Sequence, residues 1–416
     1  MLHLRLQSSV RHYHWPFWVL LIAAGLVQMA LFAYAAAPGL AGTSDSRFYL
    51  HAAQTLRQTG QLLNPDGTAY RFWPPLYPVL LGVCGSPAIV RVMHGACLLG
   101  SLLLWGWLGR QLLPLRRALV LPWLLALSTP WLLVSRFVWA ESGFLLLFAA
   151  YAALLWQWQR TGRWQWWSMV TIVGFLLPLQ RTLGLFLLAG VGAGLLVGAW
   201  RWLSARSRWQ LVLHLAVSVA GGLVWQWYAL LMAGPSRYHP SQGWSQLLSS
   251  GADFGFVLGR WLLPLPTAGR GLLPDALWAA TLLVLFGLLW PRWSAQTSSE
   301  ILPAESAGNP GHLARPLLRM LWSTAAVLVA LVAGLTVFAQ SAAGIHDAER
   351  YTSVLFGPVI LLALVAWPTR APRWLGQIVV AAWLLSAALR VSHVAADLHK
   401  LPPIVSESVT GPGAHQ

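Results

Sequence analysis

The chain has 416 residues, of which 57% are hydrophobic and only 9% are charged. A water-soluble protein of this length needs a more highly charged surface, so the composition excludes that class and predicts a membrane protein. The net charge of +16 comes from 27 Lys and Arg against 11 Asp and Glu, and Lys400 is the only lysine. Because the arginines flank apolar runs instead of forming one patch, membrane orientation explains them better than nucleic-acid binding does.

About eleven apolar runs are long enough to cross roughly 30 Å of hydrocarbon as helices. They are expected near residues 17–37, 87–113, 118–135, 138–158, 166–180, 182–200, 210–232, 276–291, 317–340, 352–367 and 374–393. With the N-terminus in the cytoplasm, the short arginine-rich connections fall on the cytoplasmic side, as the positive-inside rule requires. The first run lacks a clear cleavage pattern, so it is expected to remain as the first transmembrane helix. The predicted fold class is therefore an all-α polytopic membrane protein.

The sequence divides into three parts. Residues 1–291 form a predicted N-terminal transmembrane module with two long outer loops, 38–86 and 233–275. Residues 292–316 are rich in Ser, Ala, Pro and Gly, which predicts a cytoplasmic linker, and residues 317–416 supply the C-terminal transmembrane helices. The sequence contains no phosphate-binding glycine loop, which argues against an ATP-driven pump.

The first outer loop begins with the polar stretch TSDSRFYLHAAQTLRQTG, residues 43–60. Phe48, Ala52 and Leu56 recur at helical spacing, which predicts an amphipathic helix lying along the outer membrane surface. Asp45 lies near the start of this helix. Its carboxylate can cap the helix or can accept a proton at the bilayer surface, and the spacing leaves both interpretations open.

Glu141 interrupts an apolar stretch at the outer end of a predicted span, in the sequence SRFVWAESGFLLLF. An unpaired charge is costly at this depth, so we expect a partner, either Arg136 or an arginine from another loop. Arginine also suits a phosphate, because its planar guanidinium binds two oxygens at once. The outer-side candidates for an anion are Arg47, Arg181, Arg237, Arg270 and Arg350. Headgroup anchoring or internal pairing is the alternative for each of them.

A metal site is not favoured by the sequence. His51, His346, Asp347 and Glu349 could join Asp45 around a divalent ion, but their spacing matches no strong ligand signature. We therefore predict no metal and no cofactor.

The first outer loop resembles that of a known family. It carries Asp45, Arg47, Tyr49, Ala53 and Gly60 in this order, followed by the run Pro74, Pro75, Leu76, Tyr77 and Pro78. This order resembles the multi-pass glycosyltransferases of the GT-C fold, and among them the protein O-mannosyltransferases and the bacterial transferases that put aminoarabinose on lipid A. The similarity continues through Glu141, through LQRTLGLFLL with Arg181, and through AERYTSVLFGPV with Arg350 and Tyr351.

The resemblance implies transfer of a sugar from a polyprenyl-phosphate donor to a lipid, glycan or protein acceptor. The transfer takes place on the extracytoplasmic face, in a bacterial inner membrane, with inversion at the anomeric carbon. The implied catalytic residues are Asp45 and Glu141, within the module 1–291. The implied substrate-binding residues are Arg47, Tyr49, Tyr77, Arg181, Arg350 and Tyr351. These families commonly have a second acidic residue after the first Asp, whereas this chain has Ser46, which weakens the case for a paired carboxylate or a bridging metal.

Two other functions fit the composition. A secondary transporter or flippase of a lipid-linked or anionic envelope precursor would place ionisable groups midway along broken helices and would show an internal repeat. A non-catalytic partner in an envelope complex would need no gathered reactive groups. Convergence of Asp45, Glu141 and Arg350 on one outward cavity favours the enzyme, whereas a polar path across the bilayer favours the transporter.

Overall fold

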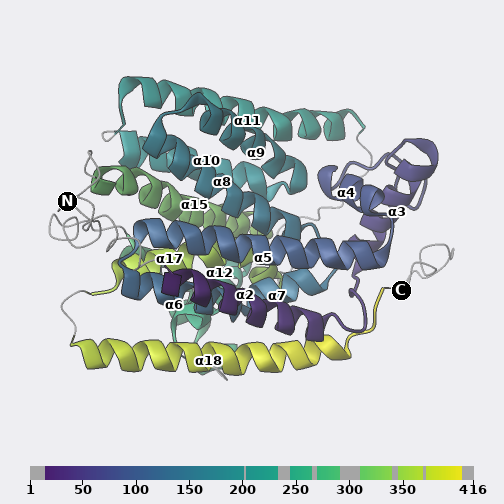
Figure 1. Ribbon diagram of the computed structural model, residues 1–416. Coiled ribbons are helices and arrows are strands. Elements are labelled where there is room, and N and C mark those ends of the chain that lie inside the picture. Colours follow the sequence, from purple (N-terminus) through teal and green to yellow (C-terminus); the bar gives the residue numbers. More distant parts are fainter. Residues whose placement is uncertain are drawn as a thin grey trace, which may run out of the picture.

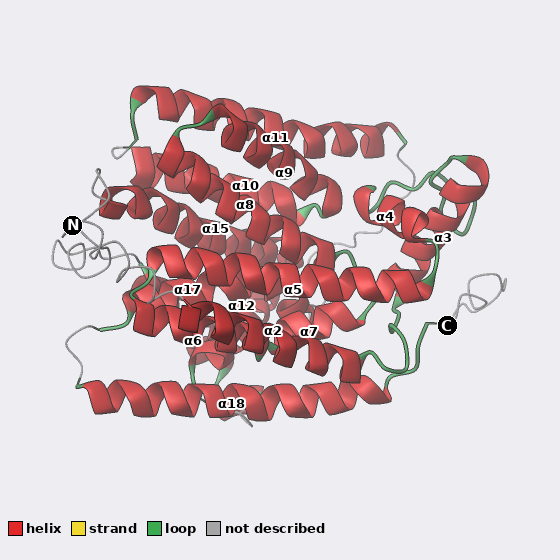
Figure 2. Ribbon diagram, in the orientation of Figure 1, coloured by secondary structure: helices red, strands yellow, loops and turns green. Residues whose placement is uncertain are grey.

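The computed structural model of the protein describes residues 15–200, 203–232, 244–264, 269–290, 310–339, 345–368 and 372–404. Within these ranges the regular structure is helical (Figures 1 and 2), with two isolated β-bridges, Ala41–Phe137 and Leu63–Ala69. The long helices run side by side in one bundle, and two short helices, α3 and α4, lie at one end of it (Figure 1). We call this end the α3 end.

The first half of the bundle is built from α2 (Trp15–Ala35), α3 (Ser44–Thr59), α4 (Leu76–Cys84), α5 (Pro87–Leu112), α6 (Leu115–Ala126), α7 (Thr129–Arg136), α8 (Glu141–Thr161), α9 (Trp164–Gln180) and α10 (Leu183–Gly194). A short π-helical turn, η1 (Leu195–Ala199), leads out of α10. The second half contains α11 (Ala205–Leu231), α12 (Trp244–Leu262), η3 (Arg270–Leu272), α13 (Asp275–Leu289), α15 (Pro310–Ala339), α16 (Ile345–Thr352), η4 (Ser353–Leu355), α17 (Phe356–Ala366) and α18 (Arg373–Lys400).

Seven stretches of the described chain are long and apolar enough to span a membrane: Trp15–Ala35, Pro87–Leu112, Leu115–Arg136, Ala205–Leu231, Ala314–Gly334, Asp347–Ala366 and Trp374–Lys400. Two shorter apolar helices, Leu183–Val197 and Asp275–Leu289, cover two more of the predicted runs. The remaining two predicted runs lie on α8, whose C-terminal end is polar, and on α9, which has only 17 residues. The all-α polytopic fold class is confirmed, and every predicted run lies on helical segments, with the run 118–135 divided between α6 and α7.

The distribution of apolar side chains also fits a membrane protein. Trp105, Trp131 and Trp158 are fully buried between helices. Large apolar side chains also point outward from the bundle, including Leu26, Val92, Val224, Leu283 and Ile378. An exposed apolar surface of this kind is stable in lipid and not in water.

The interval 233–275, predicted as an outer loop, contains the helix α12, while residues 233–243 and 265–268 lie outside the described residues. Gly251, Gly255 and Gly259 recur along α12, and all three meet the single turn of α13 at 278–281. These glycines form the surface of α12 that packs against α13. A Cβ on Gly255 would lie 1.8 Å from the carbonyl oxygen of Trp278, so only glycine permits this close approach.

Helices from the two predicted modules pack directly against each other. Ser323 of α15 donates a hydrogen bond to the carbonyl of Gly190 on α10 at 2.6 Å. Residues 292–309 of the predicted linker lie outside the described residues, and α15 begins at Pro310. The division into modules therefore stays a prediction.

Candidate active site

The turn before α3 determines where Asp45 lies. Thr43 is the N-cap of α3, and its backbone N–H donates to the hydroxyl of the buried Ser46 at 3.0 Å. Asp45 is therefore not the cap, and its carboxylate is free to reach α16. Ser46, which stands where the resembling families have a second acid, has a structural role at the helix start.

Two other segments hold the chain that leads into α3. The backbone N–H of Ala41 donates to the carbonyl of Arg136 at 2.9 Å, and the N–H of Val138 donates to the carbonyl of Ala41 at 2.9 Å. On the other side, the N–H of Ile404 donates to the carbonyl of Leu40 at 2.8 Å. These bonds join the segment to the end of α7 and to the residues after α18, so Asp45 stands on a backbone fixed from both sides.

Arg350 joins the two predicted catalytic carboxylates. Its Nη2 donates to Asp45 Oδ2 at 2.8 Å, and its Nε donates to Glu141 Oε1. The guanidinium lies over the ring of Trp139, with 4.0 Å between its carbon and the ring centroid. Trp139 Nε1 in turn donates to Thr43 Oγ1 at 2.8 Å. Three segments far apart in the sequence thus converge at the α3 end of the bundle.

Arg181 is the second cation of the cluster. Its Nη1 forms an ion pair with the same Glu141 oxygen, and its guanidinium lies 5.5 Å from the ring centroid of Tyr351. Glu141 is 2% exposed, and its other oxygen, Oε2, is buried without a hydrogen-bond donor among the described residues. Two carboxylates and two guanidinium groups balance, so the cluster of Asp45, Glu141, Arg181 and Arg350 is electrically neutral. We call these four residues the charged cluster.

Aromatic side chains pack beside the charged cluster. Tyr49 is buried, and its ring centroid lies 5.8 Å from that of Trp73 and 5.1 Å from that of Tyr77. Burial raises the pKa of Tyr49 well above its ordinary value, and the charge of Glu141 raises it further. Burial likewise raises the pKa of Tyr77. Both phenols therefore remain protonated and neutral at physiological pH.

A buried histidine links this aromatic group to α8. His94 Nδ1 lies 3.0 Å from the carbonyl oxygen of Ser135, and since a carbonyl can only accept, Nδ1 carries the proton. His94 Nε2 then accepts from the hydroxyl of Tyr77 at 2.9 Å. Ser142, the neighbour of Glu141, lies 3.2 Å from His94 Nδ1. Tyr77 is thus held in position by a polar chain that ends beside Glu141.

Several predicted residues do not join the charged cluster. The side chain of Arg47 is exposed on α3 and has no ion pair with a described carboxylate. Arg270 pairs with Asp253 at 2.7 Å and with Asp275 at 2.8 Å. Burial raises the pKa of Asp253, and the charge of Arg270 opposes that shift. Arg237 lies outside the described residues.

Arg136, one of the expected partners of Glu141, binds backbone carbonyls instead. Its Nε donates to Ala35 at 2.7 Å, and its Nη2 donates to Leu401 at 2.8 Å. Arg136 therefore ties α7 to the ends of α2 and α18. The other expected partner of Glu141 was an arginine from another loop. This expectation is confirmed, because Arg181 and Arg350 both pair with Glu141.

A second, partly buried ion pair holds the helix that carries Arg350. Arg260 Nη2 donates to Glu349 Oε2 at 2.8 Å, and Thr129 donates to Glu349 Oε1 at 3.3 Å. This pair was not predicted, because Arg260 belongs to the unexpected helix α12. Trp139 was not predicted either, although an aromatic residue two positions before Glu141 was the available signal.

The proposed metal ligands do not assemble in the described part of the chain. There, no three His, Cys, Asp or Glu side chains lie close enough to hold a metal ion. Glu349 pairs with Arg260, and Asp45 pairs with Arg350. The side chain of His346 lies outside the described residues. The absence of a metal stays a prediction.

The described helices define the chain as an all-α polytopic membrane protein. Among solved structures, the chain is similar to ArnT from Cupriavidus metallidurans bound to undecaprenyl phosphate, with a TM-score of 0.57 and 13% identity over 92% of this chain and 75% of that chain. The apo state of the same protein gives a TM-score of 0.54 and 14% identity over the same shares. Comparison with protein-family models and with curated proteins gives no match.

Proposed function

We propose that the protein is a membrane glycosyltransferase that moves a sugar from a polyprenyl-phosphate donor to an acceptor hydroxyl. The observation that carries this proposal is the convergence of Asp45, Glu141, Arg181 and Arg350 from four segments at one end of the bundle. The similarity to an ArnT structure bound to undecaprenyl phosphate supports a lipid phosphate as the carrier. We further propose that the α3 end faces the extracytoplasmic side of a bacterial inner membrane.

In this proposal Asp45 is the general base. It removes the proton of the acceptor hydroxyl as that oxygen attacks the anomeric carbon. The bond from this carbon to the phosphate oxygen breaks, and the lipid phosphate leaves with the electron pair. Attack from the face opposite to the leaving group inverts the anomeric carbon. General-base catalysis of this kind contributes typically about 10²- to 10⁴-fold to the rate.

Arg350 and Arg181 stabilise the departing phosphate. Each guanidinium has several N–H donors, and charge-assisted contacts to phosphate oxygens are strong where water is excluded. Glu141 holds both arginines, because its Oε1 atom forms an ion pair with each of them. Its role in this proposal is to position the phosphate-binding groups.

The ion pair between Arg350 and Asp45 links donor binding to the position of the base. While Arg350 pairs with Asp45, the guanidinium occupies the carboxylate oxygen Oδ2. When Arg350 turns toward a donor phosphate, that oxygen becomes available to the acceptor hydroxyl.

The experiment that tests the proposal uses purified protein and a set of undecaprenyl-phosphate-linked sugars. We expect at least one donor to be consumed, with undecaprenyl phosphate released, and this turnover to fall sharply in Asp45→Asn. Intact donors throughout, with movement of a lipid-linked sugar across a vesicle membrane, would instead support the transporter or flippase hypothesis.

A further inference from the structure

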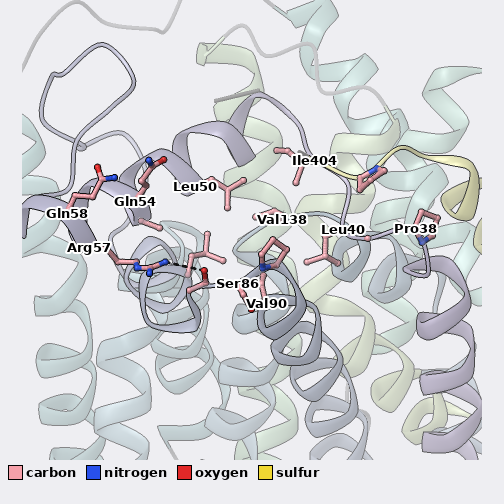
Figure 3. A pocket seen from close by; sticks show the side chains of 16 residues that line it. Pro38, Leu40, Leu50, Gln54, Arg57, Gln58, Ser86, Val90, Val138 and Ile404 are labelled. Carbon is pink, nitrogen blue, oxygen red and sulfur yellow. Dashed lines mark hydrogen bonds between the residues drawn. The ribbon is translucent and has the colours of Figure 1, made fainter. Parts of the chain in front are cut away.

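A separate pocket of about 780 Å³ opens at the α3 end of the bundle (Figure 3). Its walls come from α3, from the start of α5, from the residues after α2, and from Pro403 and Ile404 after α18. A volume of this size lies within the range of small-molecule sites, roughly 300–1,000 Å³. None of the four residues of the charged cluster lines it. The proposed sugar transfer therefore leaves this pocket without a role.

The pocket is amphipathic. Leu40, Leu50, Val90 and Val138 belong to its apolar wall. Gln54, Arg57 and Gln58 lie along one side, on the last turns of α3 (Figure 3). A ligand that matches both parts has an apolar chain and a polar head.

Among the described residues that line the pocket, Arg57 is the one with a charged side chain. Its Nη1 donates to the carbonyl of Gly85 at 3.1 Å, which holds the guanidinium beside the start of α5. The side chain is exposed, and its Nη2 has no acceptor among the described residues. The helix α5 begins at Pro87, which also lines the pocket, so its positive end adds to the charge of Arg57. The polar head that fits here is an anion.

The surroundings of the pocket indicate where the ligand comes from. The walls include the start of one candidate membrane span, α5, and the residues directly after another, α2, which places the pocket at the level of lipid headgroups. On these same helices, Tyr34 near the end of α2 and Ile89 and Val92 near the start of α5 are exposed. Exposed apolar side chains at span ends fit contact with lipid, so the bilayer is the source of ligand that the surroundings favour.

We propose that this pocket binds an anionic phospholipid of the surrounding bilayer, with an acyl chain against the apolar wall and the phosphate at Arg57. The bound lipid would join α3 to the segment after α18, since both line the pocket. Val138 lies in the same wall, directly before Trp139, which packs on Arg350. The site thus adjoins the charged cluster without including any of its residues, and its occupancy does not depend on the proposed reaction.

The test is native mass spectrometry of the full chain in detergent, titrated with phosphatidylglycerol or with phosphatidylcholine of the same acyl chains. We expect one phosphatidylglycerol to bind more tightly than phosphatidylcholine. Arg57→Gln should weaken phosphatidylglycerol binding roughly fivefold, because one arginine near an anionic headgroup contributes about that factor. Leu50→Trp, which fills the pocket, should weaken the binding of both lipids. Arg71→Gln is the matched control, since it removes a charge from the same loop outside the pocket lining.

Equal phosphatidylglycerol affinity in the wild type and in Arg57→Gln would overturn the proposal. So would an equal loss of affinity in Arg57→Gln and Arg71→Gln, because that result reports only the general charge of the loop. If undecaprenyl phosphate displaces phosphatidylglycerol in an Arg57-dependent way, the site belongs to the carrier lipid and the assignment to a bilayer phospholipid is wrong. Arg57 is exposed, so Arg57→Gln decides the question even if Leu50→Trp does not fold.

Discussion

Replacing Arg350 separates its two proposed tasks, which are holding the charged cluster together and binding the donor phosphate. Arg350 is 7% exposed and donates to two carboxylates. Removing one partner of a buried ion pair costs about 3–5 kcal/mol. Arg350→Ala should cost about the lower value, because Glu141 keeps Arg181 and the side chain of Asp45 is 24% exposed. Arg350→Lys keeps the charge and should cost less.

The loss of Arg350 should also weaken donor binding, separately from its effect on stability. A hydrogen bond to a charged group contributes about 1.5–3 kcal/mol, so losing one phosphate contact should weaken undecaprenyl phosphate binding by about 10- to 150-fold. Arg350→Lys should fall between the wild type and Arg350→Ala, because lysine lacks the planar fork. The assay is binding of radiolabelled undecaprenyl phosphate to purified protein, with thermal unfolding measured in parallel.

Arg270→Ala is a matched control, because Arg270 also bridges two carboxylates, Asp253 and Asp275, and is not part of the charged cluster. It should lower thermal stability and leave the affinity for undecaprenyl phosphate unchanged. Wild-type affinity in both Arg350 variants would remove Arg350 from the donor site. An equal loss of affinity in Arg270→Ala would show that unfolding, and not a lost phosphate contact, causes the effect.

Three further predictions concern the same end of the bundle. Glu141→Gln leaves Arg181 without a carboxylate partner among the described residues, so it should lower stability by about 3 kcal/mol and reduce turnover; an unfolding temperature equal to the wild type would contradict this. Trp139→Phe keeps a ring under Arg350 and loses the bond to Thr43, so it should cost about 0.5–1.5 kcal/mol in unfolding free energy, and a loss as large as that of Trp139→Ala would refute the ring contact. Asp66→Cys, in a background with Cys84 and Cys97 replaced by serine, should react with an impermeant reagent from outside the cell; labelling only after permeabilisation would reverse the proposed orientation.

Local patterns in the sequence predicted the helices and one side of the site. Each apolar run is helical, because a run of that length must satisfy its own backbone hydrogen bonds in lipid. Asp45 was assigned to the first outer loop, and Glu141 and Arg350 were assigned to span ends on the same side, and the structure brings the three together. This part followed from topology, since span ends on one side of a bundle share one surface.

The remaining contacts depend on packing that leaves no local pattern. Arg47 and Arg181 look alike in the sequence, yet only Arg181 meets Glu141. The helix α12 was missed because Asp253, Arg260 and repeated glycines interrupt its apolar residues, and the role of the glycines appears only in their packing against α13. The pair of Arg260 and Glu349 depends on that same helix and was missed with it.

The central claim is that Asp45 is the base, and the direct test compares two measurements on Asp45→Asn. This change preserves the shape of the side chain but removes its ability to accept the proton and its charge pairing with Arg350. We predict that the single-turnover rate of sugar transfer falls by about 10²- to 10⁴-fold. The affinity for undecaprenyl phosphate should stay the same or increase, because Arg350 loses a competing carboxylate. A wild-type rate of transfer would contradict the assignment of Asp45 as the base. A fall in rate that is fully explained by an equal fall in donor affinity would contradict it as well.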